Sequence, residues 1–258
     1  MNKIVLITGA TSGFGEACAR KFMAAGGYDI IITGRRKERL EALASSLRSA
    51  PSGQPGNVLP LVFDVQDRTA VFSAIGQLPA EWKKIDILIN NAGLALGRDL
   101  FQDANLDDWE TMIDTNVKGL LYVSKAVTPL LIEQNKGHVI NIGSVAGKEV
   151  YEKGNVYCAS KYAVDAISRA MRIDLLKHHI KVTAIHPGAA DTEFSKVRFK
   201  GDEAQAQKMY EGYTPLNAED IADTVFYCAS LPPHVCINEV NITCTAQANS
   251  FYLYKENL

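Results

Sequence analysis

The residues best suited to chemistry lie in the second half of the chain, where Tyr157 is followed four positions later by Lys161. In a helix this spacing places both side chains on one face, one turn apart. A free phenol has a pKa of about 10 and is a weak base at neutral pH, but a neighbouring ammonium favours the phenolate. The pair therefore predicts a tyrosine that exchanges the proton of a substrate hydroxyl, helped by Lys161.

Ser144 stands just after an apolar run, thirteen residues before Tyr157. A hydroxyl fixed at this place can donate a hydrogen bond to a substrate oxygen as its charge changes. A serine hydrolase is excluded, because the sequence around Ser144 reads IGSVA and lacks the GxSxG pattern. By itself, the tyrosine and lysine pair is also common on ordinary helix surfaces, so its interpretation depends on a cofactor nearby.

A glycine-rich turn near the N-terminus predicts that cofactor site. A strand-like run leads into TGATSGFG, and a helical pattern begins at Glu16. Glycines allow a tight turn and a close approach of the backbone to a pyrophosphate, and a helix N-terminus offers unpaired N–H groups. Such a turn alone is a weak indication. The predicted contacts are Gly9, Ala10, Thr11, Ser12, Gly13, Phe14 and Gly15.

Two arginines follow the second strand-like run, at Arg35 and Arg36. An NAD-selective fold would have an acidic residue there for the ribose 2′-hydroxyl. A guanidinium instead grips a 2′-phosphate in bidentate fashion, and helix N-termini otherwise favour acidic residues. The arginines therefore predict NADP as the cofactor.

Small and polar residues also follow the third and fourth strand-like runs. Asp64 and Val65 can meet the adenine, although Asp64 can equally cap a helix or turn. Asn91, Ala92 and Gly93 are small enough to leave room for the cofactor ribose.

The elements that must position these residues alternate between strands and helices. Most of the strand-like runs are continuously apolar, as buried parallel strands require, and helical patterns such as Phe14, Cys18 and Phe22 lie between them. This predicts an α/β, single-domain Rossmann-type doubly wound parallel sheet of about seven strands, with helices on both faces, over residues 1–258. The expected strands are Lys3–Thr8, Tyr28–Thr33, Val58–Phe63, Ile85–Asn90, His138–Ile142, Lys181–Ile185 and Glu239–Thr243.

Two segments interrupt this alternation. Ser49 to Asn57, rich in proline and glycine, is expected to be a surface loop rather than a domain boundary. The irregular stretch from Ala189 to Thr214 follows a strand and mixes charged with large apolar residues, so it is expected to be a lid over the site.

Composition sets the remaining limits. The net charge is −2, and the chain has no long run of charges of one sign. The sequence therefore lacks the basic surface that binding to nucleic acid or to an anionic membrane requires. The five cysteines lack paired spacing, so we expect buried thiols and no metal site. No stretch has the length of a membrane span, and the N-terminal apolar run is too short for a signal sequence. We therefore expect a cytoplasmic protein with a small-molecule substrate.

Several motifs of this chain resemble those of the short-chain dehydrogenase/reductase family. In order along the chain they are TGxxxGxG, NNAG, Asn116, Ser144, YxxxK and Pro187-Gly188. The resemblance spans nearly the whole chain. It implies a catalytic tetrad of Asn116, Ser144, Tyr157 and Lys161, in which Lys161 holds the nicotinamide ribose and Asn116 supports a water-linked proton relay. It implies nicotinamide contacts from Pro187, Gly188, Ala189 and Thr192, and a homotetramer built partly by the helices carrying Asn116 and Tyr157. Phe14 departs from the isoleucine common in the family.

Longer runs, such as DWETMIDTNVKGL and DTEFSKVRFKGD, resemble a subgroup of NADP-dependent 3-hydroxy acid dehydrogenases. That subgroup acts on serine, L-allo-threonine and related acids, and reduces malonic semialdehyde. A 3-hydroxy acid carries a carboxylate, so its pocket needs a cation or a cluster of N–H donors. Lys148, Lys153 and Arg198 are the candidates, and the sequence does not choose among them.

Two alternatives remain. One is a broad-specificity NADP-dependent carbonyl reductase whose apolar lid holds neutral ketones or aldehydes. The other is an NADP-binding sensor without turnover, for which loss of Tyr157 or Lys161 would be expected, and neither is lost.

Overall fold

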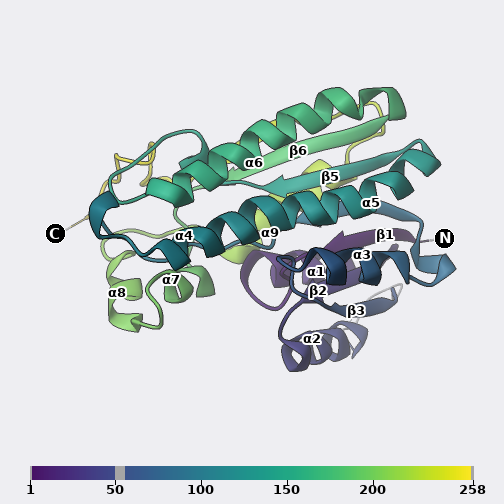
Figure 1. Ribbon diagram of the computed structural model, residues 1–258, viewed down its shortest axis with the longest axis horizontal. Helices are drawn as coiled ribbons and strands as arrows, with labels where there is room; N and C mark the ends of the chain where they lie inside the picture. The colour runs from purple at the N-terminus through teal and green to yellow at the C-terminus, as the bar shows by residue number, and fades with distance from the viewer. Residues whose placement is uncertain (1, 50–55, 257–258) are drawn as a thin grey trace.

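The computed structural model describes residues 2–49 and 56–256 and arranges seven parallel strands in one sheet (Figure 1). The strand order is β3-β2-β1-β4-β5-β6-β7. The order reverses between β1 and β4, and in such sheets the crevice at the carboxyl ends of these strands receives the ligand. The strands are β1 (Lys3–Ile7), β2 (Tyr28–Gly34), β3 (Val58–Val62), β4 (Ile85–Asn90), β5 (Gly137–Ile142), β6 (Ile180–Pro187) and β7 (Glu239–Ile242).

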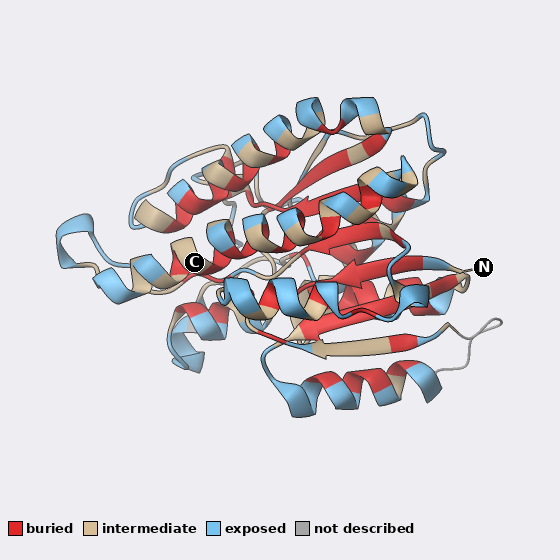
Figure 2. Cartoon of the chain, turned by 45° about the vertical axis from the view of Figure 1, so that its right-hand side comes forward, coloured by how far each residue is buried: buried red, intermediate tan, exposed pale blue. Residues whose placement is uncertain are grey.

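Helices cover both faces of the sheet, which explains why the central strands are apolar along their whole length. Helices α1, α2 and α9 share one buried cluster with the sheet, and α3, α5 and α6 pack against the other face. Figure 2 shows the central strands buried and the outer faces of these helices exposed. The helices are α1 (Gly13–Ala25), α2 (Lys37–Ser49), α3 (Arg68–Gly76), α4 (Leu106–Ile113), α5 (Leu120–Gln134), α6 (Asn155–Asp174), α7 (Glu193–Arg198), α8 (Glu203–Lys208) and α9 (Ala218–Ser230).

The sequence predicted all seven strands to within two residues at each end, and it predicted their parallel arrangement. The prediction that Ala189 to Thr214 is irregular is partly wrong, because this segment contains the short helices α7 and α8. Their N-caps explain the difference: Thr192 accepts a hydrogen bond from the N–H of Phe194, and Asp202 accepts one from Gln205. Of the predicted loop from Ser49 to Asn57, residues 50–55 lie outside the described residues.

Between α4 and α5 the backbone forms a π-helical turn over Asp114–Gly119, which the sequence did not predict. Such turns are uncommon and occur often at functional sites. Four of the cysteines are buried and Cys236 is partly exposed, and within the described residues none forms a disulfide. In the same part of the chain, no helix combines the length and the apolar composition needed to cross a bilayer.

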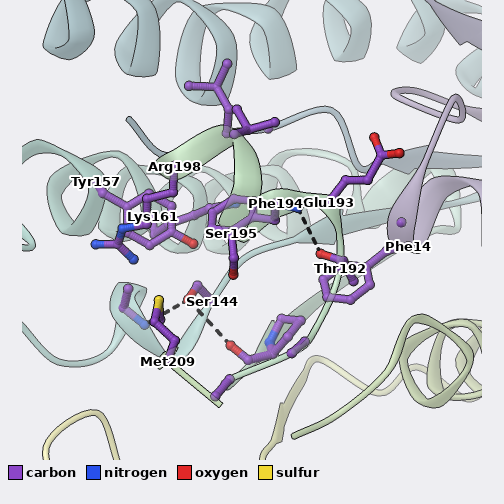
Figure 3. Close-up of a pocket in the computed structure, with 18 of the residues that line it drawn as sticks. Phe14, Ser144, Tyr157, Lys161, Thr192, Glu193, Phe194, Ser195, Arg198 and Met209 are labelled. Atoms are coloured by element: carbon purple, nitrogen blue, oxygen red, sulfur yellow. Dashed lines mark hydrogen bonds between the residues drawn. The ribbon is translucent and has the colours of Figure 1, made fainter. Parts of the chain in front are cut away.

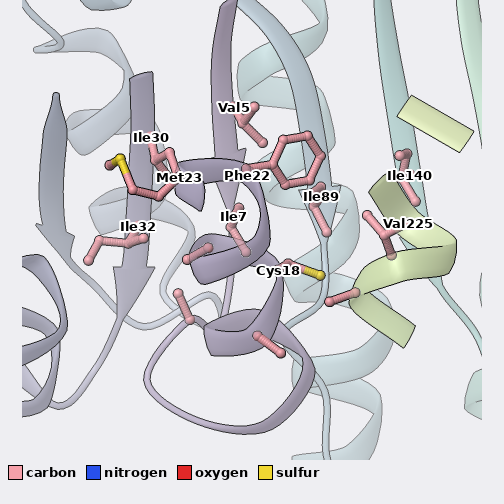
Figure 4. Close-up of a cluster of buried hydrophobic side chains, with 14 of the residues drawn as sticks. Val5, Ile7, Cys18, Phe22, Met23, Ile30, Ile32, Ile89, Ile140 and Val225 are labelled. Atoms are coloured by element: carbon pink, nitrogen blue, oxygen red, sulfur yellow. The ribbon is translucent and has the colours of Figure 1, made fainter. Parts of the chain in front are cut away.

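Phe22 joins helices α1 and α9 in the core beside the sheet (Figure 4). Its ring centroid lies 5.0 Å from that of Tyr28 and 5.2 Å from that of Phe226, both edge to face. We expect Phe22→Ala to lower the free energy of unfolding by about 3–5 kcal/mol, because a large cavity is left in a packed core. Urea unfolding followed by circular dichroism measures the loss.

Tyr227→Ala is the control for this prediction, since Tyr227 lies on α9 but its side chain is 60% exposed. It should cost no more than about 0.5 kcal/mol. Equal losses in the two variants would show that Phe22 is not part of the packed core.

Candidate active site

A cleft of about 1190 Å³ opens at the carboxyl ends of the strands. It is longer than a site for one small ligand needs, and it extends from the arginines after β2 to Tyr157 on α6. Every residue predicted above to bind cofactor or to act in catalysis lines this cleft except Ala10, Gly15 and Asn116. These three lie behind the wall, where they support it.

The glycine-rich turn between β1 and α1 has the conformation that its glycines permit. Gly9 and Gly13 have φ angles of 65° and 54°, in the left-handed region that favours glycine. A Cβ on Gly15 would lie 2.4 Å from the carbonyl oxygen of Gly9 and 2.5 Å from Nδ2 of Asn91. Gly15 therefore allows the helix to start directly under the turn.

Thr8 and Asn91 fasten this turn to the end of β4. The hydroxyl oxygen of Thr8 accepts hydrogen bonds from the N–H groups of Asn91 and Ala92, each at 3.0 Å. Asn91 Nδ2 donates to the carbonyl oxygens of Thr8 and Gly9 at 2.9 and 3.1 Å. The bonds hold the two strand ends together at the point where the strand order reverses.

The start of α1 fits an anionic group. Ser12 occupies the N-cap with extended backbone angles, yet among the described residues its side chain accepts no capping hydrogen bond. The first N–H groups of the helix are therefore not satisfied by a cap and face the cleft beside Gly13. A pyrophosphate is the kind of ligand that such a helix start binds.

Both predicted arginines lie beside this turn. The Arg36 guanidinium donates to Thr11 Oγ1 at 2.8 Å and to Ser12 Oγ at 3.1 Å, and it lies 3.5 Å from a carboxylate oxygen of Glu193. Arg35 Nη1 lies 3.4 Å from Asp64 Oδ2. Both side chains are largely exposed, so these contacts are weak and can give way to a phosphate.

The other predicted cofactor contacts line the middle of the cleft. Asp64 serves both of its expected roles, because it lines the cleft while its Oδ1 accepts a turn bond from the N–H of Gln66 at 3.0 Å. A Cβ on Gly93 would be 3.5 Å from Lys161 Nζ. Gly93 thus leaves free space beside the ammonium.

At the far end of the cleft, Tyr157 and Lys161 lie on one face of α6, as their spacing predicted (Figure 3). Both are buried, and Nζ of Lys161 lies 6.0 Å from the centre of the tyrosine ring. The ammonium donates to the carbonyl oxygen of Ile142 at 3.0 Å. That bond fixes the lysine against the end of β5.

Burial has opposite effects on these two groups. It raises the pKa of Tyr157 above its ordinary value, as does nearby Tyr151, whereas a hydrogen bond with Ser144 and the Arg198 cation lower it. Burial also lowers the pKa of Lys161 to about 8. The phenol is therefore protonated in the free protein at neutral pH, and further positive charge in the cleft would ease its ionisation.

Ser144 Oγ accepts a hydrogen bond from the N–H of Ala146 at 3.1 Å. Its own proton points to the carbonyl oxygen of Pro187 at 3.4 Å, which is a long and weak bond. The hydroxyl can therefore turn to a ligand oxygen at little cost.

Asn116 lies in the π-helical turn with its amide group turned away from the open cleft. Its Oδ1 accepts from the N–H of Leu94 at 2.8 Å, while Nδ2 donates to Leu94 O at 2.8 Å and to Ser160 Oγ at 3.0 Å. Ser160 in turn donates to the carbonyl oxygen of Tyr157 at 2.7 Å. The side chain of Asn116 thus connects the segment after β4 to the helix that carries Tyr157.

The predicted nicotinamide contacts after β6 are held by a residue that sequence reasoning missed. Gln247 Oε1 accepts from the N–H of Ala189 at 2.8 Å, and a Cβ on Gly188 would meet that oxygen at 2.2 Å. Thr192 Oγ1 accepts from the N–H of Phe194 at 3.2 Å. Nothing in the local sequence connects Gln247 with a strand end 58 residues earlier.

The structure distinguishes among the three cations that the sequence offered as partners for a substrate carboxylate. Lys148 lies outside the cleft and pairs with Asp165 at 2.7 Å and Glu239 at 2.8 Å. Lys153 lines the cleft but is exposed. Arg198 lines the cleft and is only 7% exposed.

Arg198 is poorly compensated for a buried cation. Its guanidinium carbon lies 5.5 Å from the centre of the Tyr157 ring and 5.8 Å from that of Tyr151, and Nη2 donates to the Tyr151 hydroxyl at 3.1 Å. Its buried Nε has no hydrogen-bond acceptor, and no carboxylate of the described residues lies within 4.0 Å. Tyr151 and Phe194, whose ring centre is 5.8 Å from that of Tyr157, complete this end of the cleft. Phe194 belongs to the segment that was expected to cover the site, whereas Tyr151 was not predicted.

Comparisons with known proteins agree over nearly the full length. A family model described as short chain dehydrogenase matches residues 3–203. The chain is 50% identical over 246 residues to an NADP-dependent 3-hydroxy acid dehydrogenase of Salmonella typhi, a match that covers 95% of this chain and 96% of that protein. It is 48% identical over 253 residues to sulfoacetaldehyde reductase 2 of Chromohalobacter salexigens, covering 98% of each.

Among solved structures, the chain resembles the closed form of a serine dehydrogenase complexed with NADP+, with a TM-score of 0.91 and 45% identity over 98% of this chain and 100% of that one. It also resembles a serine dehydrogenase of Escherichia coli, with a TM-score of 0.81 and 42% identity over 95% of this chain and 99% of that one.

Proposed function

The chain belongs to the short-chain dehydrogenase family, and from that premise we propose that it transfers hydride between NADP and the hydroxyl-bearing carbon of a small 3-hydroxy acid. Serine, allo-threonine and 3-hydroxypropionate are substrates of the proposed type. The names of the relatives support the cofactor and the substrate class. The buried, uncompensated guanidinium of Arg198 beside Tyr157 is the observation that carries the choice of an acid.

The proposed cofactor fits the cleft from end to end. The uncapped start of α1 and the glycine turn would hold the pyrophosphate, and Arg35 and Arg36 would hold the 2′-phosphate. Lys161 would hold the nicotinamide ribose in the space that Gly93 leaves. The other cofactor contacts proposed are Ala10, Thr11, Ser12, Phe14, Asp64, Val65, Asn91, Ala92, Pro187, Gly188, Ala189 and Thr192.

Tyr157 acts as the general acid and base of the proposed reaction. In the oxidising direction its phenolate takes the proton of the substrate hydroxyl while the carbon that bears this hydroxyl gives up a hydride. A bound nicotinamide would supply the acceptor for that hydride. Lys161 and Arg198 favour the phenolate as cations, and Ser144 leaves its weak bond to Pro187 and donates to the substrate oxygen.

Arg198 distinguishes the proposed substrate from a neutral one. A carboxylate bound by its free donors would replace the solvent that the guanidinium has lost, which a neutral ketone cannot do. This disfavours the broad carbonyl reductase, although Phe194 and Met209 give the same wall apolar surface. A sensor without turnover is disfavoured because all four residues of the proposed tetrad are present and Tyr157, Lys161 and Ser144 meet at the cleft.

We further propose that residues 189–214 act as a lid, since α7 and α8 border the cleft.

A homotetramer is proposed from the family and from exposed apolar side chains, such as Leu121 and Ile173, on α5 and α6, which lie on the same face of the sheet (Figure 1). The cytoplasmic location stays a prediction.

Replacing Arg198 with Met tests the grip on the acid. Loss of a charge-assisted bond should lower kcat/KM for 3-hydroxypropionate about ten- to a hundredfold more than for 1,3-propanediol, which has the same carbon skeleton without the carboxylate. NADP+ reduction followed by absorbance gives both values. Because Arg198 lowers the pKa of Tyr157, the rate of oxidation should also reach its plateau at higher pH in the variant.

Lys153→Met is the matched control, since Lys153 lines the same cleft but is exposed. It should change the ratio between the two substrates less than about twofold. An unchanged ratio in the Arg198 variant would reject the acid as the substrate class and favour the broad carbonyl reductase.

Tyr157→Phe removes only the phenolic oxygen. We expect it to reduce hydride transfer by at least about a thousandfold, because the variant loses the phenol that is proposed to exchange the proton, while the dissociation constant of NADPH changes less than about threefold. Single-turnover absorbance and NADPH fluorescence titration measure the two quantities. Substantial residual turnover would mean that another group moves the proton.

Arg36→Gln tests the preference for NADP. The dissociation constant of NADPH should rise about tenfold and that of NADH less than twofold, because only NADPH has the 2′-phosphate. Lys37→Gln, which removes an equal charge one residue later from an exposed side chain, is the control and should change both less than about twofold. Tighter binding of NADH than NADPH by the unaltered protein would contradict the prediction.

A further inference from the structure

A buried imidazole lies directly behind Ser144, where neither the proposed substrate nor the proposed cofactor reaches it. His186 is in β6, one residue before Pro187, and its side chain is fully buried. Its Nδ1 lies 3.2 Å from the carbonyl oxygen of Ser144. Its Nε2 has no hydrogen-bond partner among the described residues, and Asp165 Oδ1 lies 3.5 Å from it.

These contacts determine which nitrogen carries the proton. A carbonyl oxygen can only accept, so Nδ1 must be the donor in the bond to Ser144. Burial lowers the pKa of His186, and nearby Lys148 lowers it further, while Asp165, the bond to Ser144 and Glu239 act in the opposite direction. The ring is therefore neutral at neutral pH, with its proton on Nδ1 and a bare Nε2.

Two cations and two anions form a closed network beside the ring. Lys148 Nζ lies 2.7 Å from Asp165 and 2.8 Å from Glu239, and Arg169 lies 3.0 Å from Asp165 and 3.1 Å from Glu239. Asp165, His186 and Glu239 could together hold a metal ion, but the ammonium of Lys148 already bridges the two carboxylates. The network is balanced in charge, and a proton added to His186 would unbalance it.

The network connects the two parts of the active site. Asp165 lies on α6 two turns after Tyr157 and one turn after Lys161, on the same helix face. Lys148 follows Ser144 by four residues, and Glu239 belongs to β7. The ion pair between Lys148 and Asp165 therefore ties the loop after Ser144 to the helix that carries Tyr157, and His186 lies beside that ion pair.

The backbone around Ser144 fits this ring closely. A Cβ on Gly143 would lie 2.4 Å from His186 Nδ1, so only glycine lets the ring reach the carbonyl of the next residue. The same carbonyl oxygen accepts from the N–H of Gly147 at 2.8 Å. Both acceptor sites of the Ser144 carbonyl are thus used, one by its own loop and one by His186.

We propose that His186 is a positioning residue of the reaction: by donating from Nδ1 to the Ser144 carbonyl, it fixes the Ser144 hydroxyl in register with Tyr157 and Lys161. This inference rests on the proposed function of those three residues. It concerns the rate of the chemical step rather than binding, because His186 acts through the Ser144 backbone and does not itself line the cleft.

Substitution of His186 by Asn or by Gln tests the two ring nitrogens one at a time. The amide nitrogen of His186→Asn falls near Nδ1 and can still donate to Ser144, whereas that of His186→Gln falls near Nε2 and cannot. We expect the Asn variant to keep kcat within about threefold and the Gln variant to lose about ten- to a hundredfold, with KM and the NADPH dissociation constant changed less than threefold in both. Thermal unfolding is measured for both variants.

The tautomer gives a second readout that needs no turnover. In a long-range ¹H–¹⁵N spectrum of the uniformly labelled full chain, His186 should show a protonated Nδ1 and a bare Nε2. His138 is an internal control of opposite kind: Thr183 donates its proton to Ile237 O, so it accepts from a protonated Nε2 of His138 at 2.7 Å. The spectrum of the Asn variant assigns the His186 signals among the five histidines.

Retention of kcat by Asn, its loss with Gln and the Nδ1–H tautomer support the proposal. Equal kcat in the two variants, or a proton on Nε2 of His186 at neutral pH, overturns it. If the Gln variant does not fold, the tautomer and the kcat of the Asn variant decide by the same criteria. Absence of hydroxy acid oxidation by the unaltered enzyme would count against the proposed function and leave the tautomer test intact.

Discussion

The site depends on the way β1 and β4 are fastened at their carboxyl ends. A doubly wound sheet opens a crevice where its strand order reverses, but the crevice is useful only if the two strand ends keep their separation. Thr8 and Asn91 supply four hydrogen bonds across this point, and Gly15 lets α1 begin directly below it. The helix start that fits the pyrophosphate and the segment that passes Lys161 are therefore parts of one rigid edge.

Electrostatics at the other end of the cleft follow from burial. The pKa of Tyr157 is raised and that of Lys161 is lowered, so burial alone opposes the charged form of both groups. Positive charge from Arg198, and from an oxidised nicotinamide when it is bound, counters that effect for the phenol. Proton transfer is therefore favoured only when the oxidised cofactor occupies the cleft, and Tyr157 stays protonated in the free protein. A carboxylate on Arg198 would weaken this help in part, which leaves the nicotinamide as the larger contribution to ionisation of Tyr157 during oxidation.

The sequence predicted the features that depend on local spacing. The seven strands, the glycine turn and the shared face of Tyr157 and Lys161 follow from patterns of a few residues, and the structure has them where they were expected.

The sequence could not choose among Lys148, Lys153 and Arg198, because all three are cations and only contacts distant in sequence decide whose charge is compensated. Gln247 and His186 were missed for the same reason: each acts on a backbone group more than 40 residues away. The π-helical turn at Asn116 has no periodicity of its own that a helical pattern would reveal.

Helix α7 brings the two ends of the cleft under one short element. Glu193, its first residue, lies 2.9 Å from Arg39 and 3.5 Å from Arg36, beside the proposed 2′-phosphate site. Arg198, its last residue, lies over Tyr157 at the proposed acid site, and Figure 3 shows both residues around the same pocket. Glu193 and Arg198 are the two ends of one six-residue helix, so ligands at the two ends of the cleft would contact the same short element. The lid expected from the sequence stays a prediction; within it, this helix carries an anion toward the cofactor end and a cation toward the substrate end.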